Sequence, residues 1–183
     1  MSIIPIYVFG AEVLRQKAKP VKAIDNSLIA RVYDMFDTMR NANGIGLAAN
    51  QVGVLQRIIT IDISDTEEGK GTKPMVLINP EVLAEDGEWI MEEGCLSVPD
   101  IREEVIRAES IHLRFRDINF HEHEIEAHRL LARVILHEID HLDGMLFTDH
   151  LNASKRRLMK RKFAKIKKGE AETSYPVAAG VKL

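Results

Sequence analysis

The sequence predicts an α+β fold in which antiparallel or mixed β-sheets pack around one central buried helix, with further helices towards the N- and C-termini. The first reason is residues 127–142, which are apolar around most of a helical circumference, as is typical of a buried helix. The second reason is the order of the elements, because a helix is followed by several strand-like segments and then by helices again.

Size and composition agree with a single domain. The chain has 183 residues, of which 45% are hydrophobic and 29% charged, as in ordinary globular proteins. Its one cysteine, Cys95, excludes an internal disulfide and agrees with a reducing cytoplasm. Residues 1–9 contain Pro5 and lack the positive region of a signal peptide, and no run of about 18 apolar residues could span a bilayer. We therefore expect a cytoplasmic protein without a membrane partner.

The first helix is predicted at residues 26–40. Asp25, Asn26 or Ser27 can cap its N-terminus, and Gly44 follows its end. Its apolar residues share one face at helical spacing: Leu28, Val32, Met35, Phe36 and Met39.

Strands are predicted between this helix and the central one. Residues 57–63 form an apolar run, and residues 64–73 are polar and glycine-containing, as in an exposed loop. A second strand at residues 75–78 is expected to end at Asn79–Pro80. Strand-like alternation returns at residues 111–116. Residues 121–126 are polar enough for an edge strand, and three histidines in these last two segments are expected at the surface: His112, His121 and His123.

The central helix carries the sequence His-Glu-Ile-Asp-His at residues 137–141. Histidines four apart stand on one face of a helix, at a distance at which both imidazoles can bind one metal ion. Glu138, beside the first histidine, is placed to reach a metal-bound water rather than the metal. The alternative is a buried helix whose histidines are only hydrogen-bonded, but Glu138 would then need a buried partner of its own.

The same helical face is otherwise apolar. Leu130 and Val134 precede His137 at helical spacing, and His141 continues the stripe. We therefore expect the metal-binding face to open onto an apolar pocket.

A catalytic metal site needs a third protein ligand and an open position for water. In the metzincin pattern the third ligand would fall at Phe147, so that pattern fails. The better candidate lies upstream, in Glu93-Gly94-Cys95-Leu96-Ser97, because a thiolate binds zinc or ferrous iron strongly. The alternative for Cys95 is a small buried apolar side chain without a ligand role.

Three motifs in order resemble those of the peptide deformylases: residues 44–51 (Gly-Ile-Gly-Leu-Ala-Ala-Asn-Gln), residues 93–97 and residues 137–141. Two positions depart from the family pattern, since Leu136 replaces a common glutamine and Asn50 a common threonine. The resemblance implies a catalytic domain at residues 1–150, with residues 151–183 as a basic C-terminal helix and tail of the same domain.

The resemblance assigns chemistry to these residues. Cys95, His137 and His141 would bind one metal ion per chain, Fe(II) in the bacterial members, with zinc, nickel or cobalt as alternatives that the ligand set allows. Glu138 would take a proton from the metal-bound water and later return it to the leaving amine. The family is one of hydrolases that remove the N-formyl group from the formyl-methionine end of nascent polypeptides.

The remaining site residues also follow from the resemblance. The Gln51 side-chain amide and the Leu96 backbone N–H would stabilise the developing oxyanion. The methionine side chain would enter a pocket of three apolar residues: Ile45, Leu130 and Val134. The backbone from Ile45 to Gly46 would pair with the peptide, and Gly44 and Gly46 would exclude acyl groups larger than formyl. Glu93 and Arg102 occupy positions that contact substrate or pocket in the family, or else form a surface ion pair.

The last helix is predicted at residues 154–168, with Met159, Phe163 and Ile166 as its apolar stripe. Residues 155–168 hold nine basic residues and no acidic one. The rest of the chain, its acidic body, has 16 basic and 28 acidic residues and therefore a formal net charge of about −12. This basic segment is either a solvated helix face or, as in bacterial relatives, a site that docks on the ribosome. We expect no DNA partner.

Two other classes of protein remain compatible with the sequence. A zincin-type endopeptidase would not need Cys95 and would cleave unformylated peptides internally. A non-catalytic RNA-binding module with a structural metal would keep its function after Glu138→Ala, although a structural site more usually has four protein ligands.

Overall fold

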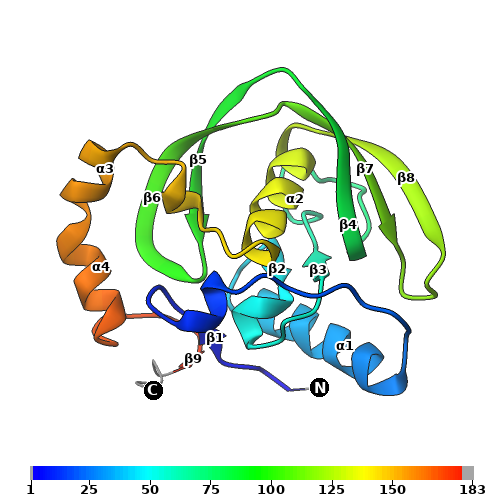
Figure 1. Ribbon diagram of the computed structural model, residues 1–183, viewed down its shortest axis with the longest axis horizontal. Coiled ribbons are helices and arrows are strands. Elements are labelled where there is room, and N and C mark those ends of the chain that lie inside the picture. Colours follow the sequence, from blue (N-terminus) through cyan, green and yellow to red (C-terminus); the bar gives the residue numbers. More distant parts are fainter. Residues whose placement is uncertain (1, 179–183) are drawn as a thin grey trace.

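The computed structural model describes residues 2–178, and its centre is helix α2 (Arg129–Leu142). Figure 1 shows α2 between a β-hairpin, made of β5 (Trp89–Cys95) and β6 (Val98–Arg107), and the strands on its other side. Ten of its residues are buried, and it packs against strands of the largest sheet. The predicted α+β class with a central buried helix is confirmed.

The largest sheet has five strands in the order β2-β3-β4-β7-β8, and all its neighbouring pairs are antiparallel. Its strands are β2 (Gly46–Ala48), β3 (Ile58–Ile61), β4 (Met75–Asp86), β7 (Ser110–Arg116) and β8 (Glu122–His128). Apolar residues of this sheet and of α2 form one core cluster. Strand β2 lies at an edge of the sheet, directly beside α2.

Helix α1 (Asn26–Asn41) agrees with its sequence pattern. The Asp25 carboxylate caps the helix by accepting the Leu28 N–H at 2.8 Å, and the predicted apolar stripe faces a second core cluster under β2 and β3. Residues 2–178 also contain three short 3-10 helices: η1 (Glu12–Arg15), η2 (Ala49–Val52) and η3 (Phe147–Asp149).

The prediction that a strand ends at Asn79–Pro80 was wrong. Strand β4 continues to Asp86, and its register with β7 shifts between Ile78 and Glu81, as in a β-bulge. Asn79 has a positive φ of 51°, and its side chain accepts the Val21 N–H at 2.8 Å and donates to the Val21 carbonyl at 2.8 Å. A bulge accommodates proline because its residues leave the regular hydrogen-bond ladder.

The β5–β6 hairpin was not predicted, because residues 89–107 mix acidic and apolar side chains without a clear alternation. The two strands are antiparallel from Trp89↔Arg107 to Gly94↔Arg102, with a register shift between Gly94 and Cys95. This shift leaves the end of β5 at Cys95 facing α2.

The last predicted helix is two helices, α3 (Ala153–Leu158) and α4 (Lys160–Lys167), which meet at Met159. Met159 and Ile166 are buried against Val98 and Ile101 of β6, so both helices attach to the hairpin side of the molecule. The last five residues of the predicted tail, 179–183, lie outside the described part of the chain.

Two short strands near the limits of the described residues pair with each other. Strand β1 (Ile6–Tyr7) pairs in parallel with β9 (Val177–Ala178), which Figure 1 shows below the hairpin. Within residues 2–178, no helix combines the length and the apolar character needed to cross a membrane.

Candidate metal centre and active site

Two elements bring three ligand-type residues together. Helix α2 contributes His137 and His141, and the end of β5 contributes Cys95. One ligand atom of each residue lies within 4.8 Å of the other two, and the Cys95 Sγ is 3.1 Å from the His141 Nε2. A sulfur and two imidazole nitrogens at this spacing form a donor set suited to Zn(II) or Fe(II).

Both imidazoles are arranged for such a site. The His137 Nδ1 lies 2.9 Å from the Glu93 Oε2, which leaves the Nε2 of this ring for another partner. Burial, with the nearby charge of His137, holds the pKa of His141 well below its usual range, so this ring is neutral. Burial alone would lower the pKa of His137, but hydrogen bonds to Cys95 and Glu93 outweigh it and raise this pKa well above its usual range. Since a neutral imidazole is the form that binds a metal ion, metal binding at His137 would release a proton.

Glu93 is buried rather than part of a surface ion pair. The Arg107 Nε donates to its Oε1 at 2.6 Å, and the Arg133 Nη1 donates to the same oxygen at 2.8 Å. Burial alone would raise the pKa of Glu93, but the hydrogen bonds from His137 and Arg107 outweigh it and hold this pKa well below its usual range. Glu93 is therefore an anion that orients a ligand-type histidine.

Arg102 does not pair with Glu93. Its side chain is exposed, and its ion-pair partner is Glu92 at 3.8 Å. Arg102 nevertheless lies opposite Gly94 in the hairpin and lines the same cavity as Glu93 and Cys95.

The Cys95 sulfur has two polar neighbours besides the two histidines. The Ser97 N–H donates to it at 3.4 Å, and the Gln51 Nε2 lies 3.8 Å away. The Gln51 Oε1 accepts the Ala48 N–H at 2.8 Å and its Nε2 donates to the Ser97 Oγ at 3.1 Å, so this buried amide has a defined orientation.

Glu138 has the position of a proton-transferring group. Its side chain is buried, and its Oε2 has no hydrogen-bond partner among residues 2–178. Burial is the main cause that raises the pKa of Glu138 to about 7. The positive charge of His137 lowers this pKa, and the negative charge of Glu93 raises it. A Cβ at position 46 would lie 2.5 Å from the Glu138 Oε1, so Gly46 lets the edge strand β2 approach this carboxylate.

These groups face a cavity of about 930 Å³, within the usual size range for small-ligand sites. It brings together the sequence-predicted residues Ile45, Gly46, Gln51, Glu93, Cys95, Leu96, Arg102, Leu130, Val134, His137 and Glu138. His141 is fully buried behind them. The apolar part of the lining includes Leu130 and Val134 of the expected α2 stripe and Ile45, together with hairpin residues such as Met91 and Ile101.

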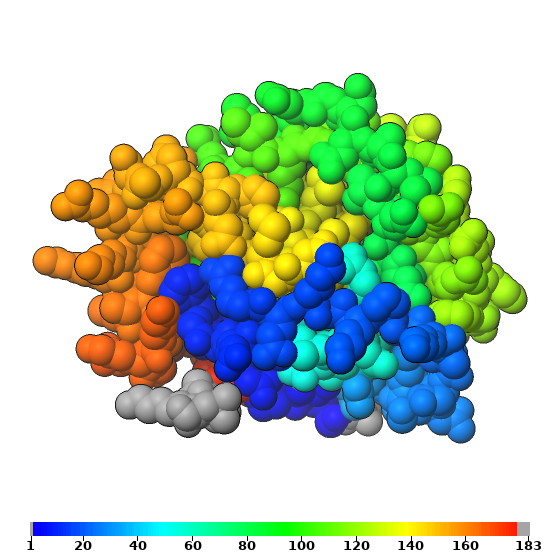
Figure 2. Space-filling view, viewed as in Figure 1, coloured from blue at the N-terminus to red at the C-terminus, as the bar shows by residue number. Residues whose placement is uncertain are grey.

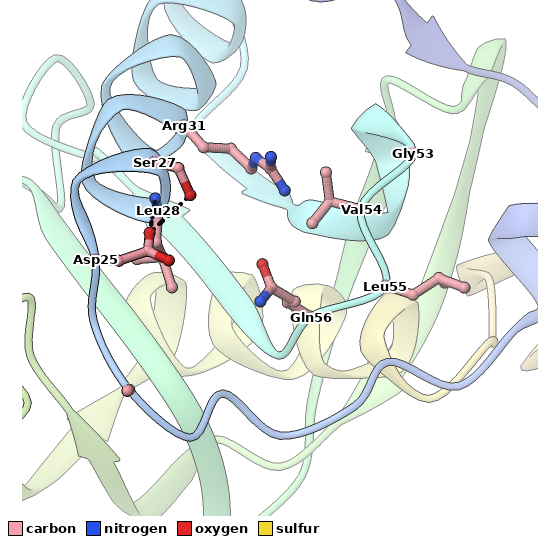
Figure 3. Close-up of a pocket in the computed structure, with 9 residues that line it drawn as sticks. Asp25, Ser27, Leu28, Arg31, Gly53, Val54, Leu55 and Gln56 are labelled. Atoms are coloured by element: carbon pink, nitrogen blue, oxygen red, sulfur yellow. Dashed lines mark hydrogen bonds between the residues drawn. The ribbon is translucent and has the colours of Figure 1, made fainter.

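A second cavity of about 380 Å³ lies between the start of α1 and residues 53–56, as Figure 3 shows. Its ionisable side chains are Asp25 and Arg31, and Asp25 already caps α1 through the Leu28 N–H. Cys95, His137 and His141 do not line this second cavity, so the candidate active site is the cavity of about 930 Å³.

Sequence reasoning missed several residues around the site. Arg107 bonds Glu93 and, through its Nη1 at 2.8 Å, Asp140, while Arg133 is buried and also donates to the Val105 and Trp89 carbonyls. The sequence signal that could have identified Arg133 is its position one turn before His137 on a mostly apolar helix. Tyr175 was missed as well, because nothing in the sequence places residues 172–175 at the cavity, which they line.

Comparisons with known proteins find relatives over most of the chain. The family model for polypeptide deformylases matches residues 3–157. A peptide deformylase of Prosthecochloris aestuarii is 48% identical over 96% of this chain and 95% of its own length, and one of Salinibacter ruber is 45% identical over 96% and 94%.

Solved structures are similar too. The crystal structure of a peptide deformylase from Legionella pneumophila has a TM-score of 0.85 and 42% identity, covering 94% of this chain and 99% of its own. A class I type b peptide deformylase from Acinetobacter baumannii, solved with Met-Ala-Ser bound, has a TM-score of 0.77 and 32% identity over 82% of this chain and 99% of its own.

Proposed function

This chain belongs to the polypeptide deformylase family, and on that premise we propose that it removes the N-formyl group from the formyl-methionine end of nascent polypeptides. The observation that supports this reaction most directly is the cluster of Cys95, His137 and His141 beside the buried carboxylate of Glu138. Cys95, His137 and Glu138 line one cavity that is large enough for a short peptide end, and His141 is buried behind them.

One metal ion per chain would be held by the Cys95 Sγ and the two histidines. The donor set fits Fe(II), our proposal from the family resemblance, and it also fits zinc, nickel or cobalt. When bound, the ion supplies a Lewis acid that lowers the pKa of a coordinated water towards about 7.

Glu138 moves the proton in this proposal. Its Oε2 accepts a proton from the water that attacks the formyl carbon, because this oxygen has no competing hydrogen bond among the described residues. The bond between the formyl carbon and the methionine nitrogen then breaks, and Glu138 delivers the proton to the departing amine. The products are formate and a free N-terminus.

Gln51 and Leu96 would stabilise the charge that develops on the formyl oxygen. Gln51 is oriented by Ala48 and lines the cavity next to Cys95, and Leu96 follows Cys95 directly. One correctly placed donor is typically worth about 3–4 kcal/mol of the barrier.

The methionine side chain would occupy the apolar part of the cavity, between Ile45, Leu130 and Val134. Strand β2 is an edge strand, so the backbone from Ile45 to Gly46 has a free side on which an extended peptide can add as a further strand. The close approach of Gly46 to Glu138 and Val134 leaves room for a formyl group and excludes bulkier acyl groups by clash. The relative with Met-Ala-Ser bound supports a peptide product of this kind.

Glu93 and Arg102 have different parts in this proposal. Glu93 lines the cavity, but its oxygens are already engaged by His137, Arg107 and Arg133, so it contributes to the site chiefly through His137. Arg102 is exposed and lines the same cavity, where its guanidinium can contact the peptide beyond the methionine.

We also propose that the basic segment at residues 155–168 docks the enzyme on the ribosome, in the cytoplasm, where its substrate emerges. Figure 2 shows α3 and α4, in orange, projecting at one edge of the molecule. Lys155 pairs with Glu103 at 2.9 Å and Lys162 donates to the Asp100 carbonyl at 3.1 Å, while the other seven cations of this segment are exposed. We propose no DNA or membrane partner.

Release of formate from formyl-Met-Ala-Ser tests the reaction. The protein is purified without oxygen, and its metal content is measured on the same sample. We expect activity with about one metal ion per chain, and its loss in Glu138→Ala with the metal retained.

Three outcomes would contradict the proposal. Internal cleavage of unformylated peptides by a Cys95→Ala variant would indicate a zincin-type endopeptidase. Full activity in Glu138→Ala would exclude this residue as the base. A wild-type protein that is loaded with nickel and still inactive would have a different acyl substrate.

A further inference from the structure

The C-terminal segment reaches the cavity, and its Tyr175 contacts the segment that follows Cys95. The Tyr175 hydroxyl donates a hydrogen bond to the Leu96 carbonyl at 2.7 Å, and residues 172–175 line the same cavity as Cys95 and Glu138. We propose that Tyr175 is a positioning residue that fixes the backbone at Leu96, so that the Leu96 N–H stays aimed at the reacting carbonyl. This inference rests on the proposed deformylation.

The backbone after Cys95 is held from two sides by the two ends of the chain. The Phe9 N–H donates to the Ser97 carbonyl at 2.7 Å, while Tyr175 binds the preceding carbonyl, that of Leu96. The Ser97 N–H donates to the Cys95 Sγ. Both polar backbone groups of Ser97 and the carbonyl of Leu96 are therefore engaged.

The chain ends that provide these contacts are joined to each other. Strand β9 pairs with β1, and the Ile6 N–H donates to the Pro176 carbonyl at 3.0 Å, one residue after Tyr175. The Thr173 Oγ1 donates to the Tyr175 carbonyl at 2.8 Å and closes a turn in front of β9. Tyr175 is thus attached to a paired strand rather than to a free tail.

The Tyr175 side chain is suited to this contact. Its ring packs on the same apolar cluster as the Leu96 side chain and Ile6. Burial, followed by the charges of Cys95 and Asp100, raises the pKa of Tyr175 to about 12, so the hydroxyl keeps its proton and remains a donor at neutral pH.

Fixing the Leu96 carbonyl restricts rotation about the bonds of Leu96. Without the Tyr175 hydroxyl this carbonyl would have no partner in a half-buried position, and the residue would sample other orientations. An oxyanion donor acts through preorganisation, so a loosely held N–H stabilises the transition state less than a fixed one. The methionine pocket lies on α2 and Ile45 and does not depend on this contact.

Tyr175→Phe tests the inference, because it removes the hydroxyl and keeps the ring. We expect kcat for formate release to fall about three- to tenfold while KM changes less than about twofold, with metal content unchanged. Thr173→Val, which loosens the turn, should lower kcat in the same direction but less. Tyr33→Phe is the matched control, since Tyr33 is 61% exposed on α1, and it should behave as wild type.

A second measurement does not depend on activity. Amide hydrogen exchange of Leu96 should be faster in Tyr175→Phe than in wild type, in metal-free and zinc-loaded protein alike, and unchanged in Tyr33→Phe. This comparison can be made even if no formate is released.

The outcomes separate the two proposals. A wild type that releases no formate contradicts the proposed function, while the exchange rates still test Tyr175. Wild-type kcat and exchange in Tyr175→Phe would overturn the positioning role and leave deformylation standing. A rise in KM at constant kcat would also overturn it, because Tyr175 would then bind substrate directly.

Discussion

Glu93 shows how one buried carboxylate can serve both a site and the stability of the chain. It accepts hydrogen bonds from Arg107 and Arg133 and holds the His137 imidazole through its other oxygen. Arg107 in turn bonds Asp140, which also lies 2.7 Å from the His150 Nε2. A network in which every charge has a partner orients a ligand-type residue better than one isolated hydrogen bond does.

Glu93→Gln should weaken metal binding. The amide keeps the shape of the side chain but removes the negative charge that orients His137, so we expect about a 10- to 100-fold decrease in metal affinity. The free energy of unfolding should fall by about 3 kcal/mol, because Arg107 and Arg133 lose the charge that compensates their burial. Titration with a competing chelator and urea unfolding measure the two effects.

Glu92→Gln is the control for this change, since Glu92 is the exposed neighbour on the same strand. It should alter neither quantity measurably. Equal metal affinity in Glu93→Gln and wild type would mean that Glu93 only stabilises the fold.

At the scale of elements, strand β4 contains a bulge at Asn79, a residue with an unusual backbone conformation. Asn79 sits at the bulge with a φ of 51°, and its side chain joins β4 to the segment at Val21 through two hydrogen bonds. Asparagine tolerates this backbone region better than most residues with a side chain. The bulge therefore lets one strand pass a proline and remain in the sheet.

Two substitutions at Asn79 separate the backbone from the side-chain contribution. Asn79→Ala removes both hydrogen bonds and places alanine at positive φ, and it should lower the free energy of unfolding by about 2–4 kcal/mol. Asn79→Gly removes the same hydrogen bonds without the steric cost, so its decrease should be smaller by about 1 kcal/mol. Urea unfolding of both variants and wild type provides the comparison.

A glycine variant less stable than the alanine variant would contradict this assignment. It would mean that the added flexibility of glycine in the unfolded chain outweighs the strain at this position.

At the scale of the whole molecule, charge is divided between an acidic body and the basic segment on α3 and α4. Eight of the nine cations of this segment are exposed, and Figure 2 shows α3 and α4 at one edge of the molecule. A positive edge on an otherwise negative protein orients it towards polyanions.

The proposed docking on the ribosome predicts a specific salt dependence. Replacing Arg156, Lys160 and Lys168 by glutamine should weaken ribosome binding and reduce the slope of log affinity against log salt by roughly one for each phosphate group that the variant no longer binds. Formate release from a free peptide should not change. Sedimentation with ribosomes over a series of salt concentrations measures the slope.

The control replaces Lys17, Lys22 and Lys73, which are exposed on the body, by glutamine. Net charge changes equally in both triple variants, so an equal decrease in affinity would indicate a general charge effect and not a docking site.

The sequence by itself determined helix α2, its apolar stripe and the metal-binding pattern of His137 and His141. These features are local, because helical spacing alone places the residues on one face. The same holds for α1 with its Asp25 cap. Cys95 was a candidate for the third ligand from its chemistry alone, but no local pattern relates it to histidines that lie more than 40 residues later.

Only the tertiary structure decided how Cys95 and Glu93 meet that helix. The β5–β6 hairpin has no clean alternation, yet it forms a pair of strands whose end lies at the histidines. It contacts η3 and accepts hydrogen bonds from Arg133 of α2 at the Trp89 and Val105 carbonyls. The Glu93 partners Arg107 and Arg133 come from different elements, and Tyr175 reaches Leu96 only because β9 pairs with β1. Such contacts join residues far apart in the chain, and their free energy depends on burial that no local pattern encodes.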